Sequence, residues 1–215
     1  MRHALLLLVL LPCLADAQAA AKSRPGKRAL LPAAKEIALA RSAAPAEVSR
    51  DATVYVLTDT GYAVAIAGSN GNACLVDRSW PESLEPQCFD PEARATIMQT
   101  SLAQMAGIQQ GRPPEAIDHD LAEGLRSGRF RLPTRPAMGY MMSSAQRLIG
   151  DDGRAAGNWQ PHLMLFMPYM TSEQLGLGST PNPAAGIMVD SGKPMANLMV
   201  IVKKFVDPAE PPDGH

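Results

Sequence analysis

Short runs of apolar and polar residues in the first half of the chain predict β-strands. Residues 53–57 are β-branched and aromatic, residues 62–67 place apolar side chains on alternate positions, and residues 73–78 form a third such run. The Gly-Ser-Asn-Gly step at 68–71 favours a tight hairpin between the second and third runs. The pattern therefore predicts a three-strand antiparallel meander.

Helical patterns flank this meander. The alanine-rich segment 33–43 precedes it. After it, the segment 91–105 begins with Pro91 and follows Asp90, a candidate N-cap. The segment 114–126 places apolar residues on one helix face. The sequence thus predicts one helix before the meander and two after it.

The last third of the chain predicts three further strands, at 138–143, 162–167 and 198–205. Strands that are grouped, instead of alternating with helices, indicate an α+β domain around an antiparallel sheet. The element order loosely resembles that of PAS and GAF modules. Such folds host many functions, so this likeness implies no activity.

The N-terminus predicts a secretory signal peptide at residues 1–19. Arg2 and His3 precede an apolar run over residues 4–14, and small residues suitable for cleavage follow. Lipidation of Cys13 is an alternative, although the preceding Pro12 disfavours it. We therefore expect an exported protein, periplasmic or extracellular.

Beyond the signal peptide we expect a disordered linker at 20–32, a single globular α+β domain at 33–206 and a disordered tail at 207–215. Twenty Lys and Arg residues balance 21 Asp and Glu residues, and they are interspersed. Without a basic stripe, the sequence does not favour nucleic acid as a partner. No later apolar run is long enough to predict a membrane span.

Cleavage of the signal peptide would leave two cysteines, Cys74 and Cys88. An even number in an oxidising compartment predicts a disulfide, which for a loop of this length contributes about 3 kcal/mol. The alternative is a redox or metal-binding thiol pair. The spacing differs from C-x-x-C, and no further sulfur ligand is available, so the structural disulfide is favoured.

A set of short segments forms a further pattern: residues 55–57, 61–62, 70–71, 74–76, 78, 88–90, 161–164 and 168–169. In this pattern the chain resembles a group of uncharacterised exported bacterial proteins with no assigned activity. The resemblance implies a bacterial origin. It brings no catalytic residue and no ligand with it.

The best candidate site lies on and after the predicted strand 162–167. His162 begins this strand, Met164 and Phe166 share its face if the strand is regular, and Tyr169 follows. These four residues predict a binding site with an apolar surround. The expected function is a non-enzymatic module that binds an unknown small molecule or protein, without a cofactor.

Two other functions remain open. His162 with Ser143 or Ser144 could form the site of a periplasmic hydrolase, although no G-x-S-x-G, S-x-x-K or H-E-x-x-H motif is present. Methionines concentrated late in the chain could bind copper(I) together with a histidine, although methionine is also ordinary core filler. His119 and Glu123 are typical of the solvent-exposed face of a helix, so the sequence predicts no metal site there.

Overall fold

The computed structural model describes residues 26–149, 153–157, 159–178 and 180–209. The predicted signal peptide, residues 20–25 of the predicted linker and residues 210–215 of the predicted tail lie outside these residues. Within the described part of the chain, no helix has the length and apolar character needed to cross a membrane.

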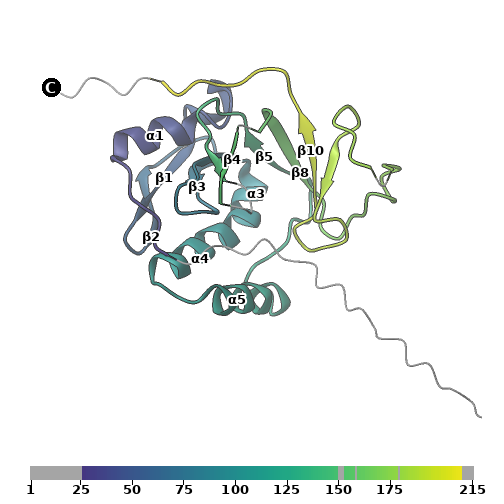
Figure 1. The fold of residues 1–215 in the computed structure, drawn as a ribbon, viewed down its shortest axis with the longest axis horizontal. Coiled ribbons are helices and arrows are strands. Elements are labelled where there is room, and N and C mark those ends of the chain that lie inside the picture. Colours follow the sequence, from purple (N-terminus) through teal and green to yellow (C-terminus); the bar gives the residue numbers. More distant parts are fainter. Residues whose placement is uncertain (1–25, 150–152, 158, 179, 210–215) are drawn as a thin grey trace, which may run out of the picture.

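Eight strands form one mixed sheet in the spatial order β2-β1-β3-β4-β5-β8-β10-β9 (Figure 1). They are β1 (Thr53–Thr58), β2 (Gly61–Ile66), β3 (Ala73–Asp77), β4 (Glu85–Phe89), β5 (Ala137–Met141), β8 (His162–Phe166), β9 (Ile187–Val189) and β10 (Asn197–Ile201). A separate two-stranded hairpin contains β6 (Leu148–Ile149) and β7 (Ala155–Gly157).

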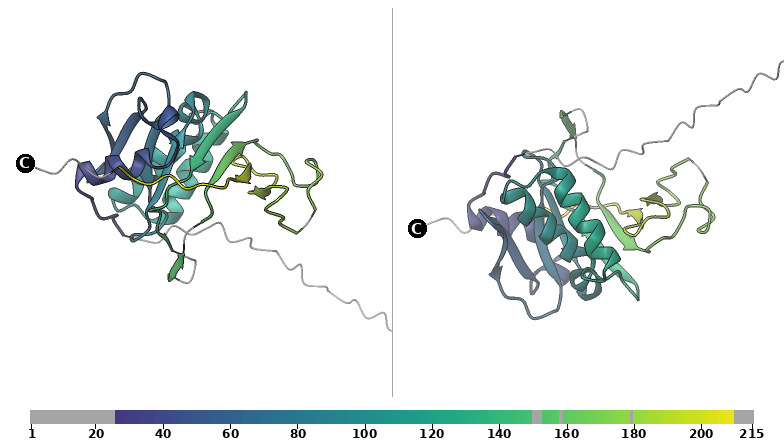
Figure 2. Two further views of the ribbon diagram at one scale, coloured as in Figure 1. Left: turned by 90° about the horizontal axis from the view of Figure 1, so that it is seen from above. Right: turned by 90° about the horizontal axis from the view of Figure 1, so that it is seen from below.

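Five helices cover the first strands of this sheet. They are α1 (Ala33–Arg41), α2 (Ala46–Ser49), α3 (Pro91–Ala95), α4 (Ile97–Gln109) and α5 (Pro114–Arg126). The helix α1 packs on β1, β3 and β4, while α3 packs on β4 and β5, and α4 on β2. Seen from below, α4 and α5 lie in front of the sheet (Figure 2). The fold is therefore mixed α/β, with helices on both faces of its N-terminal half.

The predicted antiparallel meander is wrong in its spatial order. β1 and β2 pair antiparallel, but β3 lies on the other side of β1 and runs parallel to it. The connection at 68–71 is therefore a crossing beneath the start of β1, not a hairpin. A Cβ on Gly68 would lie 2.2 Å from the Thr53 nitrogen, so only glycine permits this close passage.

The PAS/GAF-like element order is also wrong, because the sheet has eight strands and includes a parallel pair.

The sequence pattern did not predict β4, because Pro86 is unusual in a strand interior. The structure accommodates it because β4 pairs with β5 only at Cys88 and Phe89, which leaves Pro86 bonded on one side alone. The helix predicted at 91–105 is two helices, since Thr96 leaves helical geometry between α3 and α4.

β3 is buried on both faces and organises two cores. Cys74 and Val76 contact the residues under α1, whereas Ala73 and Leu75 belong to the cluster under α3 and α4. Successive side chains of a strand point to opposite faces, so four consecutive buried residues need cover on both sides. This explains why the chain places helices on each side of β3.

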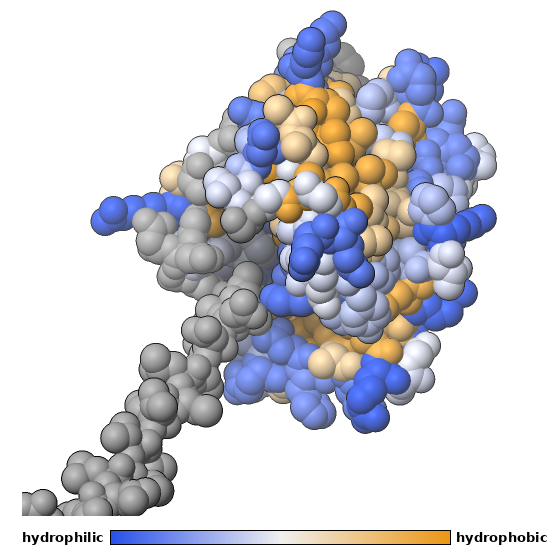
Figure 3. Space-filling view, turned by 90° about the vertical axis from the view of Figure 1, so that its right-hand side faces the viewer, coloured by the Kyte–Doolittle hydropathy of each residue, from blue (hydrophilic) through white to orange (hydrophobic). Residues whose placement is uncertain are grey.

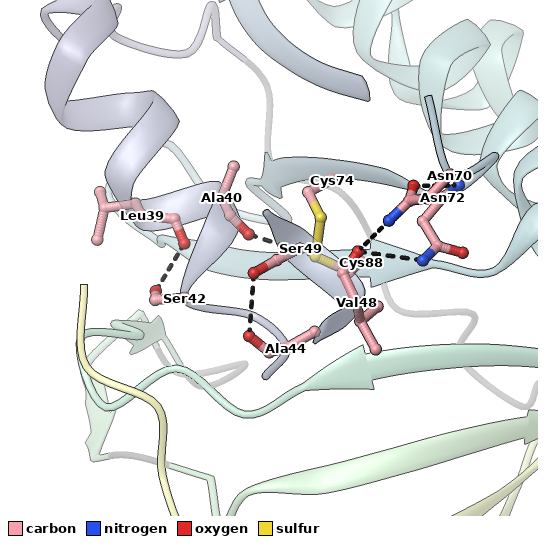
Figure 4. Close-up of a disulfide and its surroundings, with 10 residues drawn as sticks. All are labelled: Leu39, Ala40, Ser42, Ala44, Val48, Ser49, Asn70, Asn72, Cys74 and Cys88. Carbon is pink, nitrogen blue, oxygen red and sulfur yellow. Dashed lines mark hydrogen bonds between the residues drawn. A yellow bond between two sulfur atoms is a disulfide. The ribbon is translucent and has the colours of Figure 1, made fainter. Parts of the chain in front are cut away.

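The predicted disulfide is confirmed. Cys74 and Cys88 lie directly opposite each other on β3 and β4, with their Cα atoms 4.1 Å apart. Figure 4 shows the bond beneath the end of α1, where the Ala40 carbonyl lies 3.5 Å from the Cys88 sulfur. Both cysteines are fully buried. The bond therefore joins two neighbouring strands inside the core.

A buried ion pair connects α1 to the sheet. Arg78, directly after β3, lies 3.0 Å from the Glu36 carboxylate on α1, and both side chains are buried. The same Glu36 oxygen accepts a hydrogen bond from the backbone nitrogen of Leu57 in β1, at 3.1 Å. Burial raises the pKa of Glu36, while Arg78 opposes this shift. One carboxylate thus joins α1, β1 and the end of β3.

Arg28 attaches the N-terminal segment to the same region, and it corrects the linker prediction for residues 26–32. Its side chain is 2% exposed and donates to the backbone carbonyls of Arg78 and Ser79. Its backbone nitrogen donates to the Gln109 side chain at 2.7 Å, and Gln109 donates back to its carbonyl. The linker composition did not reveal this anchoring, because the partners are about 50 to 80 residues away in sequence.

We expect Glu36→Gln to destabilise the protein by about 3–5 kcal/mol, because it leaves the Arg78 charge buried without a counterion. Chemical denaturation monitored by circular dichroism measures this change. Glu47→Gln on the exposed surface of α2 is the matched control, and it should change the free energy of unfolding by less than about 0.5 kcal/mol. A similarly small effect for Glu36→Gln would show that the ion pair does not stabilise the fold.

Asp77 and Glu85 lie directly opposite each other on β3 and β4. Burial, and then the Glu85 charge, raise the pKa of Asp77 to about 6, although the Arg78 backbone nitrogen donates to it at 2.8 Å. The unfolded carboxyl titrates near its ordinary value of 3.8. The raised pKa of Asp77 therefore stabilises the folded state fully below pH 3.8. This stabilisation is lost as the pH rises through about 6.

We accordingly expect the free energy of unfolding of the wild type to fall, relative to that of Asp77→Asn, between about pH 4 and pH 7. Urea denaturation across this range measures the difference, and titrations common to both proteins cancel. Asp59→Asn, in the exposed turn between β1 and β2, serves as the control. A constant difference across the range would contradict the raised pKa.

Candidate functional site

Three of the four predicted site residues share one face of β8. His162, Met164 and Phe166 are buried and alternate with the half-buried Leu163 and Leu165. Met164 and Phe166 belong to the core cluster under α3 and α4, so Met164 is mainly a packing residue. His162 and Phe166 lie at opposite ends of a five-residue strand, about 13 Å apart. The strand therefore carries two separate local environments.

His162 occupies a buried environment at the start of β8. Its Nδ1 atom lies 2.7 Å from the Gln160 carbonyl oxygen. A carbonyl can only accept, so Nδ1 carries the proton and Nε2 presents a lone pair. Burial lowers the pKa of His162, with the Gln160 hydrogen bond as an opposing effect. Nε2 is buried and has no hydrogen-bond partner among the described residues.

Trp159 and Met141 lie next to this imidazole, and Gln146 bonds to the backbone of Trp159. The indole of Trp159 lies beside it, with the ring centroids 5.6 Å apart. Gln146 donates from its Nε2 to the Trp159 carbonyl at 2.9 Å, and its buried Oε1 has no partner in the described structure. Met141 is the cross-strand partner of His162 on β5, so the two side chains share a face. Trp159 and Gln146 were not predicted as site residues.

The two candidate serines are bonded elsewhere. The Ser143 hydroxyl is buried and lies 2.6 Å from the Ser42 hydroxyl, just after α1. The Ser144 hydroxyl donates to Asp207. The nitrogen of His162 that would accept a serine proton is unpartnered in the described structure. The structure therefore does not assemble a serine–histidine pair from these residues.

A cavity of about 280 Å³ lies at the other end of β8, lined by residues 133–137 and 165–168. We call it the Phe166 groove. Three of its nine lining residues are prolines and four more are Ala, Leu, Phe or Met. Because proline fixes its own backbone angle, such walls are rigid before any ligand binds.

One ion pair holds the first wall of the Phe166 groove against α3. Glu92 on α3 accepts from the Arg135 side chain at 2.6 Å and from the Thr134 backbone nitrogen at 3.3 Å. The hydrogen bond from Arg135 is the main cause that lowers the pKa of Glu92. The opposite wall is the end of β8, so both walls rest on regular elements of the fold.

The C-terminal strands extend beyond the helices. Packing of α1, α3 and α4 is concentrated on β1 to β5, and β8, β10 and β9 pack mainly on β5 and on one another. Half-buried Leu163, Leu165, Met188 and Leu198 remain on the face of these strands opposite His162 and Phe166. Figure 3 views the molecule from the right-hand side of Figure 1 and shows hydrophobic residues gathered at the surface between hydrophilic ones. The four leucine and methionine side chains are therefore only partly covered by the rest of the fold.

Tyr169 lies immediately beyond the groove, in a strained turn. It is 59% exposed and has a φ of 64°. Its backbone nitrogen donates to the Lys193 carbonyl, which belongs to a second turn where Asp190 has a φ of 51°. Among the described residues, these two are the non-glycine residues with positive φ. Backbone strain held by two mutually bonded turns often accompanies a functional site.

A second cavity, of about 380 Å³, lies within the loop that contains residues 172–188. This loop projects away from the sheet (Figure 1). Its described lining residues include no ionisable side chain, and most of them are Gly, Pro, Ala, Ser or Thr. The cavity is larger than the Phe166 groove, but apart from Ile187 and Met188 of the short edge strand β9 its walls are loop, and its lining is less apolar than that of the groove.

Comparison with protein-family models, curated proteins and solved structures finds no match for the chain. The geometry described above is therefore the basis for any functional assignment.

We expect Tyr169→Gly to be more stable than Tyr169→Ala by about 1 kcal/mol, because only glycine adopts the positive φ of this turn without steric cost. Denaturant titrations of the two variants measure this difference. Both variants lose the same exposed ring, so the comparison isolates the backbone. Equal stability would show that the turn relaxes to an unstrained conformation.

Proposed function

We propose that this protein is a non-enzymatic binding module that takes a compact, apolar small molecule in the Phe166 groove. The observation that carries the proposal is the preformed groove between the segment 133–137 and the end of β8. Its apolar lining supplies affinity, since buried apolar area contributes about 25 cal/mol per Å². Its volume is slightly below the usual range for drug-sized ligands, which favours a compact one.

The surrounding structure supports this role. Phe166 forms part of the core cluster under α3 and α4 as well as part of the groove. A ligand there would contact a side chain whose position is already set by the core, so little ordering entropy is lost on binding. Exposed Tyr169, one residue beyond the groove, offers an aromatic ring at its edge.

The proposed location is outside the cytoplasm, as expected from the predicted signal peptide. The Cys74–Cys88 bond supports it, because structural disulfides persist mainly in oxidising compartments.

The test uses indole and toluene as probes and follows the backbone amide signals by NMR. We expect saturable shifts at Arg135, Ala137 and Met167, which line the groove. Thr134→Phe places a ring at the exposed rim and should abolish these shifts. Thr60→Phe makes the same change at the exposed β1–β2 turn and should leave them intact.

Shifts that persist in Thr134→Phe would contradict the groove as the binding site. Shifts confined to residues 172–188 would also contradict the Phe166 groove, and they would show that the probes bind in the loop cavity.

A further inference from the structure

The environment of His162 contains an unused lone pair. The Gln160 carbonyl fixes the proton on Nδ1, and Nε2 is buried without a partner among the described residues. A buried acceptor left without a hydrogen bond destabilises the folded state. Histidines that bind metal ions commonly donate the other ring nitrogen to a backbone carbonyl in this way. The imidazole is thus oriented and protonated as a metal ligand would be.

A thioether lies next to this lone pair on the same face of the sheet. Met141 is the direct cross-strand partner of His162, and such partners have Cβ atoms about 4.5–5.5 Å apart. The methionine side chain is unbranched and flexible, so its sulfur can approach an ion bound to the imidazole. Ile201 occupies the corresponding position on the other side of His162 and offers no donor atom.

The charge of the surroundings selects the kind of ion. Among the described residues, the effects on the pKa of His162 are burial and the Gln160 hydrogen bond, and no charged side chain is among them. In the described residues, no three His, Cys, Asp or Glu side chains are grouped to hold a metal ion. A divalent cation would therefore be buried without compensating negative charge, which is costly. A soft monovalent ion fits neutral nitrogen and sulfur donors better.

We propose that His162 Nε2 and the Met141 thioether bind a cuprous ion at the start of β8. Gln146 acts as a positioning residue, because its hydrogen bond to the Trp159 carbonyl holds the segment that carries Gln160. Trp159 lies beside the imidazole as an apolar side wall. This site is independent of the Phe166 groove, which lies at the other end of the strand.

The experiment titrates the full mature chain anaerobically with cuprous ion, in competition with the chromophoric chelator bathocuproine disulfonate. We expect one bound ion per chain. His162→Gln and Met141→Leu should each weaken binding about tenfold or more, as loss of a metal-site contact does. X-ray absorption of the loaded protein should show both a nitrogen and a sulfur scatterer.

Matched controls separate this site from adventitious sites. His119→Gln on the exposed side of α5 and Met188→Leu on the opposite face of the sheet should bind copper like the wild type. Thermal unfolding confirms that the variants are folded, and the near-isosteric Met141→Leu provides the test if His162→Gln does not fold. Cys74 and Cys88 are joined in a buried disulfide and do not compete for the ion.

Three results would overturn the proposal: no uptake against the chelator, equal affinity in wild type and Met141→Leu, or sulfur-only scattering. Indole binding in the Phe166 groove should be unchanged in Met141→Leu, so failure of either proposal is distinguishable from failure of the other.

Discussion

The contact between Glu36 and Arg78 is the constraint on which the arrangement of the N-terminal half depends. A buried carboxylate and a buried guanidinium tolerate little displacement, because separation would leave two uncompensated charges in the core. Glu36 also accepts from Leu57, and the Arg78 carbonyl accepts from Arg28. This ion pair, with the hydrogen bonds around it, therefore fixes the position of α1 relative to β1, the end of β3 and the N-terminal segment.

The C-terminal half of the sheet has less helical cover than this N-terminal half. β5 is the boundary: its Tyr140 packs into the core under α1, while its partner β8 begins the strands with less helical cover. Both candidate sites use β8, which is anchored to β5 along its full length and yet reaches the edge of the covered region. The fold thereby places a polar, buried environment at one end of a strand and an apolar, open one at the other.

Local patterns in the sequence predicted most helices and strands, but not their spatial arrangement. The alternation in residues 53–78 identifies β1, β2 and β3, whereas the placement of β3 beside β1 follows from the close passage at Gly68, which is a contact in three dimensions. β4 was hidden by Pro86, since proline disfavours interior strands and the unpaired side that tolerates it is visible only in the sheet. Glu36 lies among the buried positions of an alanine-rich helix, a signal that could have indicated a buried ion pair.

The residues of the two candidate sites could likewise be predicted only in part from the sequence. His162 was identified from its place before an apolar strand, but Trp159 and Gln146 join it through loop contacts that no periodicity encodes. The Phe166 groove depends on the register that sets Ala137 opposite Phe166. The burial of Cys74 and Cys88 also limits their chemistry, because an oxidant or a reductant cannot reach sulfurs that the closed core encloses. Oxidation of this pair therefore requires a state in which α1 has not yet docked over β3 and β4, or has opened away from them.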